Sequence, residues 1–378
     1  MSIYFDNAAT TPISQEAKTA MVAAMENFGN PSSTHAEGRK AKAIVETVRK
    51  GIASRLNCSP SEITFTGGGT EADNWALISA VKDCGVKHLY TSVIEHHAVS
   101  HVVEYLDQNG MCKVQYIPHD DHGIHDLKWL ELELKSKALL GEKAMVSLMH
   151  ANNEIGNIID LQNLSELCQS HGAYLHSDTV QTMAHLPLDF SKIRVDFAAC
   201  SGHKFHGPKG VGFAFVRQGV LSKPLIRGGA QERGARAGTE NVIGIAGLGA
   251  AFNMCVDDMA NDILKVTGVK NYAILKLKSE FPEIKFNGLS GDVEKSLYTV
   301  LNFYHHKLHE NGMLNFQLDI NGVHCSGGSA CSSGAVGGSH VLNALNSSGG
   351  TRISFSRYTT KSEVDLFVQI LQKIKSDI

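Results

Sequence analysis

A β-rich run meets a glycine-flanked polar segment in residues 196–211, which read Asp196-Phe197-Ala198-Ala199-Cys200-Ser201-Gly202-His203-Lys204-Phe205-His206-Gly207-Pro208-Lys209-Gly210-Val211. The runs 196–199 and 211–216 are typical of buried strands. Five further strand candidates precede them, at 62–66, 87–91, 114–117, 144–149 and 173–176, with amphipathic helical patterns between most of them. That alternation predicts an α/β fold with a mainly parallel sheet covered by helices. Because sites in such sheets form beyond the carboxyl ends of the strands, chemistry is expected just after each strand.

The pattern changes near Met259. A long helical pattern there is followed by strand-like runs at 284–286, 298–304 and 352–355, a Gly/Ser-rich segment, and a closing helix from Thr360. This order predicts a smaller α+β domain. We therefore expect a large domain over residues 14–257 and a small domain formed by residues 1–13 and 258–378. The Gly/Ser-rich segment, at about 325–339, would be a loop of the small domain.

The composition excludes several functional classes. With 378 residues, of which 43% are hydrophobic, the chain can bury a large core. The formal net charge of -3 and the lack of a Lys/Arg run give no attraction for nucleic acid or for an anionic membrane surface. The longest apolar stretch, 241–256, is broken by glycines and is shorter than a membrane span, so it predicts a buried helix. We expect neither nucleic acid nor membrane as a partner.

Cysteine usage and the N-terminal residues bear on the compartment. The eight cysteines include no CxxC pair and follow no regular framework. The opening residues, Met1-Ser2-Ile3-Tyr4-Phe5-Asp6, lack the features of a signal peptide. Reduced thiols in a cytoplasmic protein are therefore expected.

Lys204 and Asp178 each follow a predicted strand, Asp178 within His176-Ser177-Asp178-Thr179-Val180-Gln181. A lysine among polar neighbours at a strand end can form a Schiff base with a carbonyl cofactor. A buried carboxylate beside a pyridine nitrogen keeps that nitrogen protonated, as an electron-withdrawing pyridine cofactor requires. Each residue alone has a plainer interpretation, Lys204 as a solvated surface residue and Asp178 as a helix cap. Their positions after consecutive strands favour the cofactor interpretation.

A glycine run also lies between a strand and a helix, in Phe65-Thr66-Gly67-Gly68-Gly69-Thr70-Glu71-Ala72-Asp73-Asn74. Glycines such as Gly69 let backbone N–H groups approach a phosphate at the positive end of a helix, and the Thr70 hydroxyl is a further donor. The run lacks the ending of a nucleotide P-loop and the spacing of a dinucleotide-binding motif. The alternative interpretation is a tight strand-to-helix turn.

Together these segments resemble the cysteine desulfurases, a branch of the fold type I (aspartate aminotransferase-like) pyridoxal-phosphate enzymes. The resemblance runs nearly end to end, from Tyr4-Phe5-Asp6-Asn7-Ala8-Ala9-Thr10-Thr11-Pro12 and Gly29-Asn30-Pro31-Ser32-Ser33 to Arg352-Ile353-Ser354-Phe355. It implies an aspartate aminotransferase-like fold with a seven-stranded sheet in the large domain. It also implies pyridoxal 5'-phosphate as the cofactor and L-cysteine as the substrate.

The resemblance further implies roles for individual cofactor-binding residues. Lys204 resembles the lysine that carries the cofactor, and Asp178 resembles the partner of its ring nitrogen. Asn153, in Asn152-Asn153-Glu154-Ile155-Gly156, and Gln181 resemble the groups near the cofactor's phenolic oxygen, and Asn153 would also contact the substrate. The residues that look like the phosphate cradle are Gly69, Thr70, Ser201 and His203.

Three more residues take roles through the resemblance. His96, in Glu95-His96-His97-Ala98-Val99, matches the histidine that lies on the cofactor ring and handles protons, although a histidine there is otherwise a helix-start residue. Arg352 matches the arginine that binds the substrate carboxylate through its planar fork, in preference to the neighbouring Arg357. Thr239, in Gly234-Ala235-Arg236-Ala237-Gly238-Thr239-Glu240-Asn241, resembles the residue that reaches the phosphate from the neighbouring subunit. A homodimer is thereby implied.

The discriminating stretch is Ser326-Gly327-Gly328-Ser329-Ala330-Cys331-Ser332-Ser333-Gly334-Ala335-Val336-Gly337-Gly338-Ser339. Apart from Cys331 and Val336 it contains only Gly, Ala and Ser, a composition that flexes readily. Sulfur abstraction needs a thiolate that reaches the bound substrate and then delivers its persulfide, so a mobile nucleophile is suitable. The stretch resembles the long-loop group of desulfurases, with Gly327 in place of a serine. Cys331 is the predicted nucleophile.

Other clusters receive plainer interpretations. Cys325 could form a dithiol with Cys331, but a strand-end apolar residue is favoured. The run 119–125, His119-Asp120-Asp121-His122-Gly123-Ile124-His125, fits no standard zinc pattern and is interpreted as a solvated turn. The pair His305-His306 is interpreted in the same way. We predict no metal site.

The predicted reaction leaves L-alanine and a Cys331 persulfide, for iron–sulfur cluster assembly or another sulfur transfer. A sulfur-acceptor protein, either a scaffold or a sulfurtransferase, is the expected partner, and the sequence does not identify it. A selenocysteine lyase or an aminotransferase on the same scaffold is an alternative; a ketoacid product without sulfide would indicate an aminotransferase. A non-catalytic sulfur-transfer partner is a further alternative, but the joint presence of Lys204, Asp178, His96, Arg352 and Cys331 speaks against it.

Overall fold

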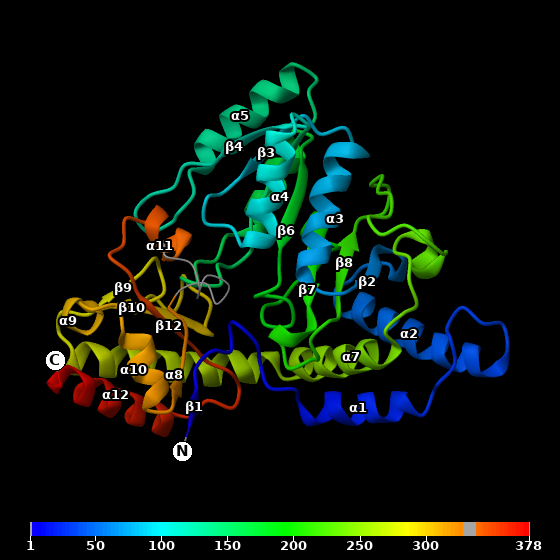
Figure 1. The fold of residues 1–378 in the computed structure, drawn as a ribbon. Coiled ribbons are helices and arrows are strands. Elements are labelled where there is room, and N and C mark those ends of the chain that lie inside the picture. The colour runs from blue at the N-terminus through cyan, green and yellow to red at the C-terminus, as the bar shows by residue number, and fades with distance from the viewer. Residues whose placement is uncertain (1, 328–337, 378) are drawn as a thin grey trace.

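The computed structural model describes residues 2–327 and 338–377 (Figure 1). The predicted nucleophile Cys331 lies outside the described residues. Among the described helices, none alone has the length and apolar composition to cross a membrane; only α7 (Val242–Asp257) and α8 (Met259–Glu280), taken as one segment bent by 73°, pass that test.

A seven-stranded sheet forms the centre of the larger part of the molecule, with strands in the order β2-β8-β7-β6-β5-β3-β4. Their bounds are β2 Ile63–Thr66, β3 His88–Thr91, β4 Lys113–Tyr116, β5 Ala144–Ser147, β6 Tyr174–Asp178, β7 Phe197–Ser201 and β8 Gly212–Val216. All pairs from β7 to β4 are parallel, whereas β8 is antiparallel to both of its neighbours, β2 and β7. The predicted α/β fold with a mainly parallel sheet is confirmed.

Two strands extend further than the sequence pattern predicted. β6 continues to Asp178, which pairs with Ala199, and β7 continues to Ser201, which pairs with Gly212. The polar side chains ended the apolar pattern, but their backbones still complete the ladder. Asp178 and Ser201 therefore lie inside the carboxyl ends of two adjacent strands, at the edge where sites form in such sheets.

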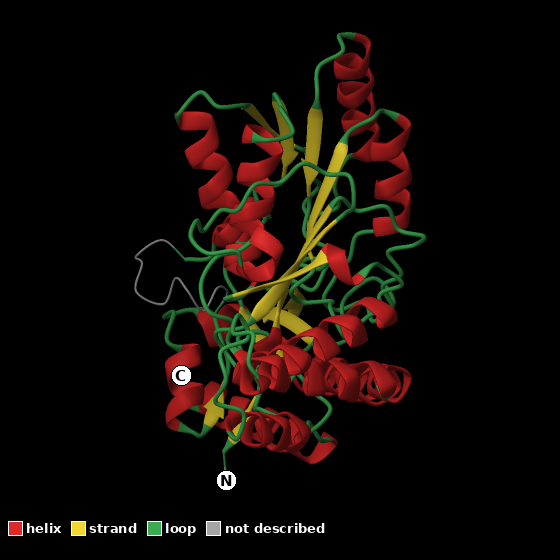
Figure 2. Ribbon diagram, turned by 90° about the vertical axis from the view of Figure 1, so that its right-hand side faces the viewer, coloured by secondary structure: helices red, strands yellow, loops and turns green. Residues whose placement is uncertain are grey.

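Helices lie on both sides of the central strands (Figure 2). Their bounds are α1 Gln15–Met25, α2 Ala36–Arg55, α3 Gly69–Lys82, α4 His97–Gln108, α5 Leu127–Leu139 and α6 Leu161–Ser170, together with α7; η1 Pro60–Glu62, η2 Gly202–Lys204 and η3 Gln231–Gly234 are short 3-10 turns. The predicted buried helix is α7. Its glycines allow close packing, since a Cβ at Gly247 would lie 2.6 Å from Met21 of α1 and one at Gly249 would lie 2.6 Å from Val48 of α2.

The remaining elements form a second, smaller assembly with its own hydrophobic core. It contains α8, a three-stranded sheet in the order β12-β10-β9, and a two-stranded sheet β1-β11. The bounds are β1 Ile3–Tyr4, β9 Lys285–Phe286, β10 Val300–Tyr304, α9 His306–His309, α10 Leu314–Ile320, β11 Val323–His324, α11 His340–Ala344, β12 Thr351–Ser354 and α12 Lys361–Ser376. The closing helix begins where predicted, because Thr360 and Glu363 form a capping box.

The N-terminal segment links the two assemblies. Phe5 exchanges backbone hydrogen bonds with β11 and β12, since its N–H donates to His324 O and its carbonyl accepts from Ser354 N. Further along, Thr11 N donates to His203 O and Ser14 N donates to His206 O. Residues 5–14 therefore tie β12 to the turn that carries Lys204.

Candidate active site

A cavity of about 250 Å³ opens at the carboxyl ends of β6 and β7. Ten of the site residues predicted from the sequence line this cavity: Gly69, Thr70, His96, Asn153, Asp178, Gln181, Ser201, His203, Lys204 and Arg352. They come from segments up to 283 positions apart in the chain, between Gly69 and Arg352. The parallel sheet brings them together, because successive strands end at the same edge.

The Lys204 side chain reaches into this cavity from η2. Its Nζ donates to the carbonyls of Ala8 and Ala9, at 2.7 and 3.0 Å. Gln181 donates from Nε2 to the same Ala8 carbonyl at 3.0 Å. The backbone carbonyl of Lys204 in turn lies 3.0 Å from His185 Nε2. The amine is thereby held at the cavity wall next to the N-terminal segment.

Asp178 ends β6 with its carboxyl group buried at 5% exposure. Its Oδ1 accepts a hydrogen bond from Val180 N at 2.9 Å. Burial raises the pKa of this carboxyl to about 6, against the opposing effects of Val180 N–H and of Lys204. A protonated pyridine nitrogen would supply the positive charge that such a buried carboxylate lacks, so Asp178 fits the predicted role.

The glycine run is shaped to hold an anionic group. Gly68 has φ +152, and α3 begins at Gly69 without a hydrogen bond from a capping side chain. A Cβ at Gly69 would lie 2.5 Å from Val180 Cγ2, so only glycine fits. The first N–H groups of a helix have no partner within the helix. Ser201 and His203 line the same cavity and add to a set of donors suited to a phosphate.

His96 is a helix-start residue and also a residue of the cavity, while its role toward the cofactor stays a prediction. It caps α4, with Nδ1 accepting from Ala98 N at 3.1 Å, and it lines the cavity. Burial, followed by the charge of Lys204, lowers the pKa of His96 to about 4. The ring is therefore neutral at physiological pH, and the cap fixes Nδ1 as the acceptor.

Arg352 lies on β12 and is only 1% exposed. Its Nη1 donates to the backbone carbonyl of Asn153 at 2.8 Å, and its Nη2 donates to Asp6 Oδ1 at 2.9 Å. Among the described residues its Nε–H has no acceptor. A buried guanidinium with an unused donor is suited to a carboxylate ligand.

Thr239 does not join this cavity within one chain. It lines a separate space of about 70 Å³ beside Thr66, Gly67 and Arg236. The structure therefore brings Thr239 close to the start of the glycine run but not to Lys204. Its predicted contact with the phosphate of a neighbouring subunit stays a prediction.

Residues 119–125 and Cys325, which lie outside this cavity, match their sequence interpretation only in part. Residues 119–125 do form a turn, with Gly123 at φ +76, but His125 is half-buried and its Nε2 lies 2.8 Å from Ser92 Oγ. Cys325 is half-buried, and burial raises its pKa to about 12, as suits an apolar strand-end residue.

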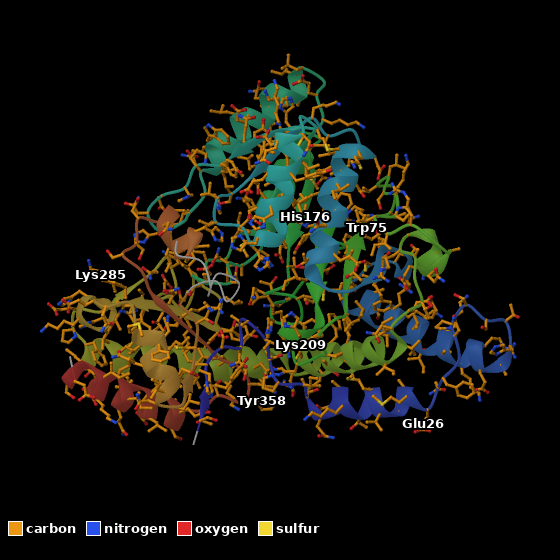
Figure 3. The ribbon with its side chains drawn as sticks, viewed as in Figure 1. Glu26, Trp75, His176, Lys209, Lys285 and Tyr358 are labelled. Carbon is orange, nitrogen blue, oxygen red and sulfur yellow. The ribbon has the colours of Figure 1, made fainter. Side chains whose placement is uncertain are left out.

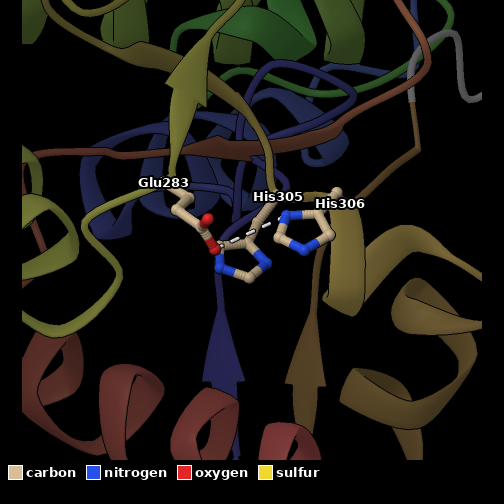
Figure 4. Close-up of side chains that lie close together, drawn as sticks. All are labelled: Glu283, His305 and His306. Atoms are coloured by element: carbon tan, nitrogen blue, oxygen red, sulfur yellow. Dashed lines mark ion pairs between the residues drawn. The ribbon is translucent and has the colours of Figure 1, made fainter.

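The interpretation of His305 as part of a solvated turn was wrong: the side chain is fully buried and caps α9. Glu283, His305 and His306 lie close together (Figure 4) and are the one trio of possible metal ligands within the part of the chain that the structure describes. The two rings stack 5.1 Å apart with planes inclined by 14°. Glu283 Oε2 also lies 3.7 Å from His306 Nδ1, so an ion pair accounts for part of this cluster.

Sequence reasoning missed two residues of the site. Asp6 was quoted only as part of a motif, and its ion pair with Arg352 depends on a contact across 346 positions. Asp73 lines the Lys204 cavity and is buried, although it was read only as part of the glycine run. A signal was present, because Asp73 lies four residues after Gly69 and so on the same helix face.

Fold and cavity together define the fold type I class of pyridoxal 5'-phosphate enzymes. The chain belongs to the class-V aminotransferase family, whose model matches residues 3–367, and within that family to the cysteine desulfurases. It is 38% identical over 380 residues to the cysteine desulfurase IscS of Dictyoglomus turgidum, covering 98% of this chain and 94% of the relative. A solved NifS-like protein matches with a TM-score of 0.90 and 33% identity over all of both chains. SspA, solved in complex with cysteine, matches with a TM-score of 0.79 and 29% identity, over 95% of this chain and all of SspA.

Proposed function

We propose that this protein removes sulfur from L-cysteine, releases L-alanine and holds the sulfur as a persulfide on Cys331. The observation that carries the proposal is the convergence of a lysine amine, a buried carboxyl group and a buried guanidinium on one cavity, in Lys204, Asp178 and Arg352. The names of the relatives support the same activity, and the similar protein SspA was solved with cysteine.

The residues that would hold pyridoxal 5'-phosphate are those of the cavity. Lys204 would carry it, Asp178 would pair with its ring nitrogen, and Asn153 and Gln181 would lie near its phenolic oxygen. The phosphate would be held by Gly69, Thr70, Ser201 and His203. When bound, the cofactor withdraws electrons from the α-carbon of the substrate and so makes its α-proton acidic.

The chain's own residues would bind the substrate and move its protons. Arg352 would bind the substrate carboxylate with its planar fork, next to Asn153. The Lys204 amine, once released from the cofactor, would take the α-proton as a general base. The neutral His96, with Nδ1 committed to the helix cap, would exchange a proton at Nε2. These side chains are buried or half-buried, which limits their contact with bulk water.

The sulfur step would belong to Cys331. Its thiolate Sγ would form a bond to the substrate sulfur while the substrate's carbon–sulfur bond breaks. The electron pair of the broken bond stays with the substrate carbon and is then neutralised by a proton, which gives L-alanine. The sulfur atom remains on Cys331 as the outer atom of a persulfide, ready for a thiol acceptor.

A matched pair of cysteine variants tests this assignment. Cys331→Ser should stay yellow and cofactor-loaded but release no sulfide from cysteine in the presence of a thiol reductant. Cys325→Ser should keep the wild-type rate, because burial holds the Cys325 thiol protonated. Undiminished sulfide release by Cys331→Ser would reject Cys331 as the nucleophile. A ketoacid product without sulfide from the wild-type chain would instead favour an aminotransferase.

A homodimer is part of the proposal, with Thr239 of one chain contacting the cofactor phosphate of the other. Mixing two inactive variants tests it, because each hybrid of Lys204→Ala with Thr239→Arg would contain one complete site. About a quarter of the wild-type activity should return after random reassembly of equal amounts. If Thr239 served its own chain, no activity would return. Sedimentation of each variant alone checks that both remain dimeric.

Three broader assignments complete the proposal. The large domain would span residues 14–257, and the small domain would combine residues 1–13 and 258–378, consistent with two separate hydrophobic cores. The protein would work in the cytoplasm, without nucleic acid or membrane as a partner. A scaffold or sulfurtransferase would accept the persulfide for iron–sulfur cluster assembly or another sulfur transfer. A transfer assay with candidate acceptors and ³⁵S-labelled cysteine would identify the acceptor.

A further inference from the structure

A second buried carboxyl group lines the cofactor cavity beside Asp178. Asp73, on α3, is 1% exposed and lines the same cavity as Lys204. Its Oδ2 has no hydrogen-bond partner among the described residues. A buried polar atom without a partner costs about 1–3 kcal/mol. The position of Asp73 at a ligand cavity therefore points to a role toward the ligand.

The other oxygen of Asp73 is held by a buried histidine. His176 Nε2 lies 3.2 Å from Asp73 Oδ1, and His176 Nδ1 lies 2.8 Å from Ser147 Oγ. His176, labelled in Figure 3, belongs to β6, the fourth of the seven strands of the central sheet, and is fully buried. Burial lowers the pKa of His176 to about 3, so the ring is neutral. Both ring nitrogens of His176 are satisfied when Ser147 donates to Nδ1 and Nε2–H donates to Asp73 Oδ1, which leaves Asp73 Oδ2 as the atom without a partner among the described residues.

His176 and Asp178 belong to the same strand, β6, two residues apart. Their side chains therefore lie on the same face of the strand. Asp73 on α3 packs over this face, so a single column of Ser147, His176 and Asp73 runs beside the carboxyl group that would face the ring nitrogen. The column and Asp178 thus share the backbone of β6.

Two other buried carboxyl groups, Asp178 and Glu95, act electrostatically on Asp73. The titratable groups that act on it directly are Asp178 and His176 of β6 and Glu95 before α4. The charged or titratable residues that line the same cavity are His96, His203, Lys204 and Arg352. Two carboxyl groups in one dry cavity do not both ionise easily. Burial, then the charges of Asp178 and Glu95, raise the pKa of Asp73 well above its usual range. The Val180 N–H and the charge of Lys204 lower the pKa of Asp178, so Asp178 ionises before Asp73.

We propose that Asp73 is a positioning residue for the cofactor: it stays protonated, holds His176 through Oδ1, and leaves Asp178 as the single carboxylate that pairs with the ring nitrogen. This inference rests on the proposed cofactor site. The protonated Oδ2–H gives the cavity a neutral hydrogen-bond donor. A second carboxylate at this position would compete with Asp178 for the proton of the ring nitrogen. The neutral histidine column fixes the position of α3 relative to β6.

Two substitutions separate this role from a purely electrostatic one. In Asp73→Asn a neutral amide of equal size keeps an oxygen for His176 Nε2–H. In Asp73→Leu that acceptor is lost and the buried N–H is left without a partner. The measurements are the affinity of the apo chain for pyridoxal 5'-phosphate and the pH midpoint of the absorbance of the bound cofactor, both made on the full chain. Far-UV circular dichroism checks the folding of each variant.

The proposal predicts that Asp73→Asn binds the cofactor within about 2-fold of wild type and keeps the pH midpoint, whereas Asp73→Leu loses at least about 10-fold in affinity. The infrared spectrum of the wild-type protein at neutral pH should contain a protonated carboxyl band that Asp73→Asn lacks. A pH midpoint that moves as far in Asp73→Asn as in Asp73→Leu, or the absence of that band, would overturn the proposal. So would a folded Asp73→Leu that behaves like wild type.

The same experiment distinguishes a failure of the proposed cofactor site from a failure of the proposed role of Asp73. A wild-type chain that takes up no pyridoxal 5'-phosphate would refute the proposed site and with it the inference. A wild-type chain that binds the cofactor, together with an Asp73→Leu variant of unchanged affinity, would refute only the role of Asp73. If Asp73→Leu fails to fold, the Asp73→Asn spectra still decide the protonation state.

Discussion

Arg352 Nη2 donates a hydrogen bond to Asp6 Oδ1 across 2.9 Å, so the guanidinium proposed for the substrate already carries one carboxylate. The pair joins β12 to the N-terminal segment, and Arg352 is 1% exposed. A substrate carboxylate would be the second anion on the same planar fork, where Nε–H has no acceptor among the described residues. Asp6 would orient the fork, and the substrate would use its remaining donors.

Replacement of this fork by a point charge should weaken substrate binding. We expect Arg352→Lys to raise the KM for cysteine about 10- to 100-fold with a smaller effect on kcat, since charge-assisted hydrogen bonds contribute about 1.5–3 kcal/mol. Initial rates of sulfide release measure this. Arg357→Lys is the matched control, because Arg357 pairs with Asp262 at 2.6 Å and should keep the KM. Equal KM values for wild type and Arg352→Lys would contradict the assignment.

Gly69 has no room for a side chain. In Gly69→Ala the new Cβ would lie 2.5 Å from Val180 Cγ2, and Val180 N–H is the donor to Asp178. We expect the clash to lower stability by about 1–3 kcal/mol and to weaken cofactor binding as the cradle and Asp178 separate. Denaturant unfolding and cofactor titration check both effects.

The control for this substitution is Gly51→Ala in α2, where a Cβ would meet nothing within 4 Å. Alanine in an open helical position should raise the free energy of unfolding by about 0.5–1 kcal/mol. A Gly69→Ala protein that binds the cofactor as tightly as Gly51→Ala would show that the cradle tolerates displacement.

Lys204 should be the attachment point of the cofactor. Reduction of the loaded protein with borohydride should fix the cofactor mass on the peptide that contains Lys204, and Lys204→Ala should show no such mass. Lys209→Ala changes an exposed lysine of the same segment and should be labelled like wild type. Peptide mass spectrometry distinguishes the two lysines. Label on any other lysine of the wild-type chain would reject the assignment.

Lys270 makes the stability depend on pH. It is fully buried in α8, with Nζ donating to Ser296 Oγ at 2.6 Å and Leu297 O at 2.9 Å, and burial lowers its pKa to about 7. In the unfolded chain a lysine titrates near about 10.4. Between these values the unfolded chain binds more protons than the folded chain, so the free energy of unfolding rises with pH. Below about pH 7 both forms are protonated, and the full penalty of the buried charge remains.

The effect appears as a difference between wild type and Lys270→Met, which has no titrating amine. From pH 7 to pH 9 the stability of wild type relative to this variant should rise by on the order of 1 kcal/mol per pH unit. Urea unfolding at several pH values measures it. Lys278→Met, at an exposed position on the same helix, should show no such rise relative to wild type. A pH-independent difference for Lys270→Met would contradict the lowered pKa.

The local sequence pattern was sufficient to predict most of the helices and strands. The strand-like runs of the large sheet and the closing helix after Thr360 coincide with observed elements to within a few residues. Such elements are recognisable because apolar periodicity and caps are properties of neighbouring residues. The ends of β6 and β7 were underestimated, because Asp178 and Ser201 are polar and are buried only through the neighbouring segments that cover them.

The sequence by itself determined the α/β class, the chemical types at the strand ends, and the family to which Lys204, Asp178 and Arg352 point. Only the tertiary structure decided that Asp6 pairs with Arg352, that His305 is buried, and that Asp73 lines the cavity through the His176 column. The physical reason is that hydrogen bonds and desolvation depend on which side chains meet in space. Contacts across a hundred or more positions leave no periodic trace in the chain, and burial changes the charge state of a carboxyl group without changing its neighbours in sequence.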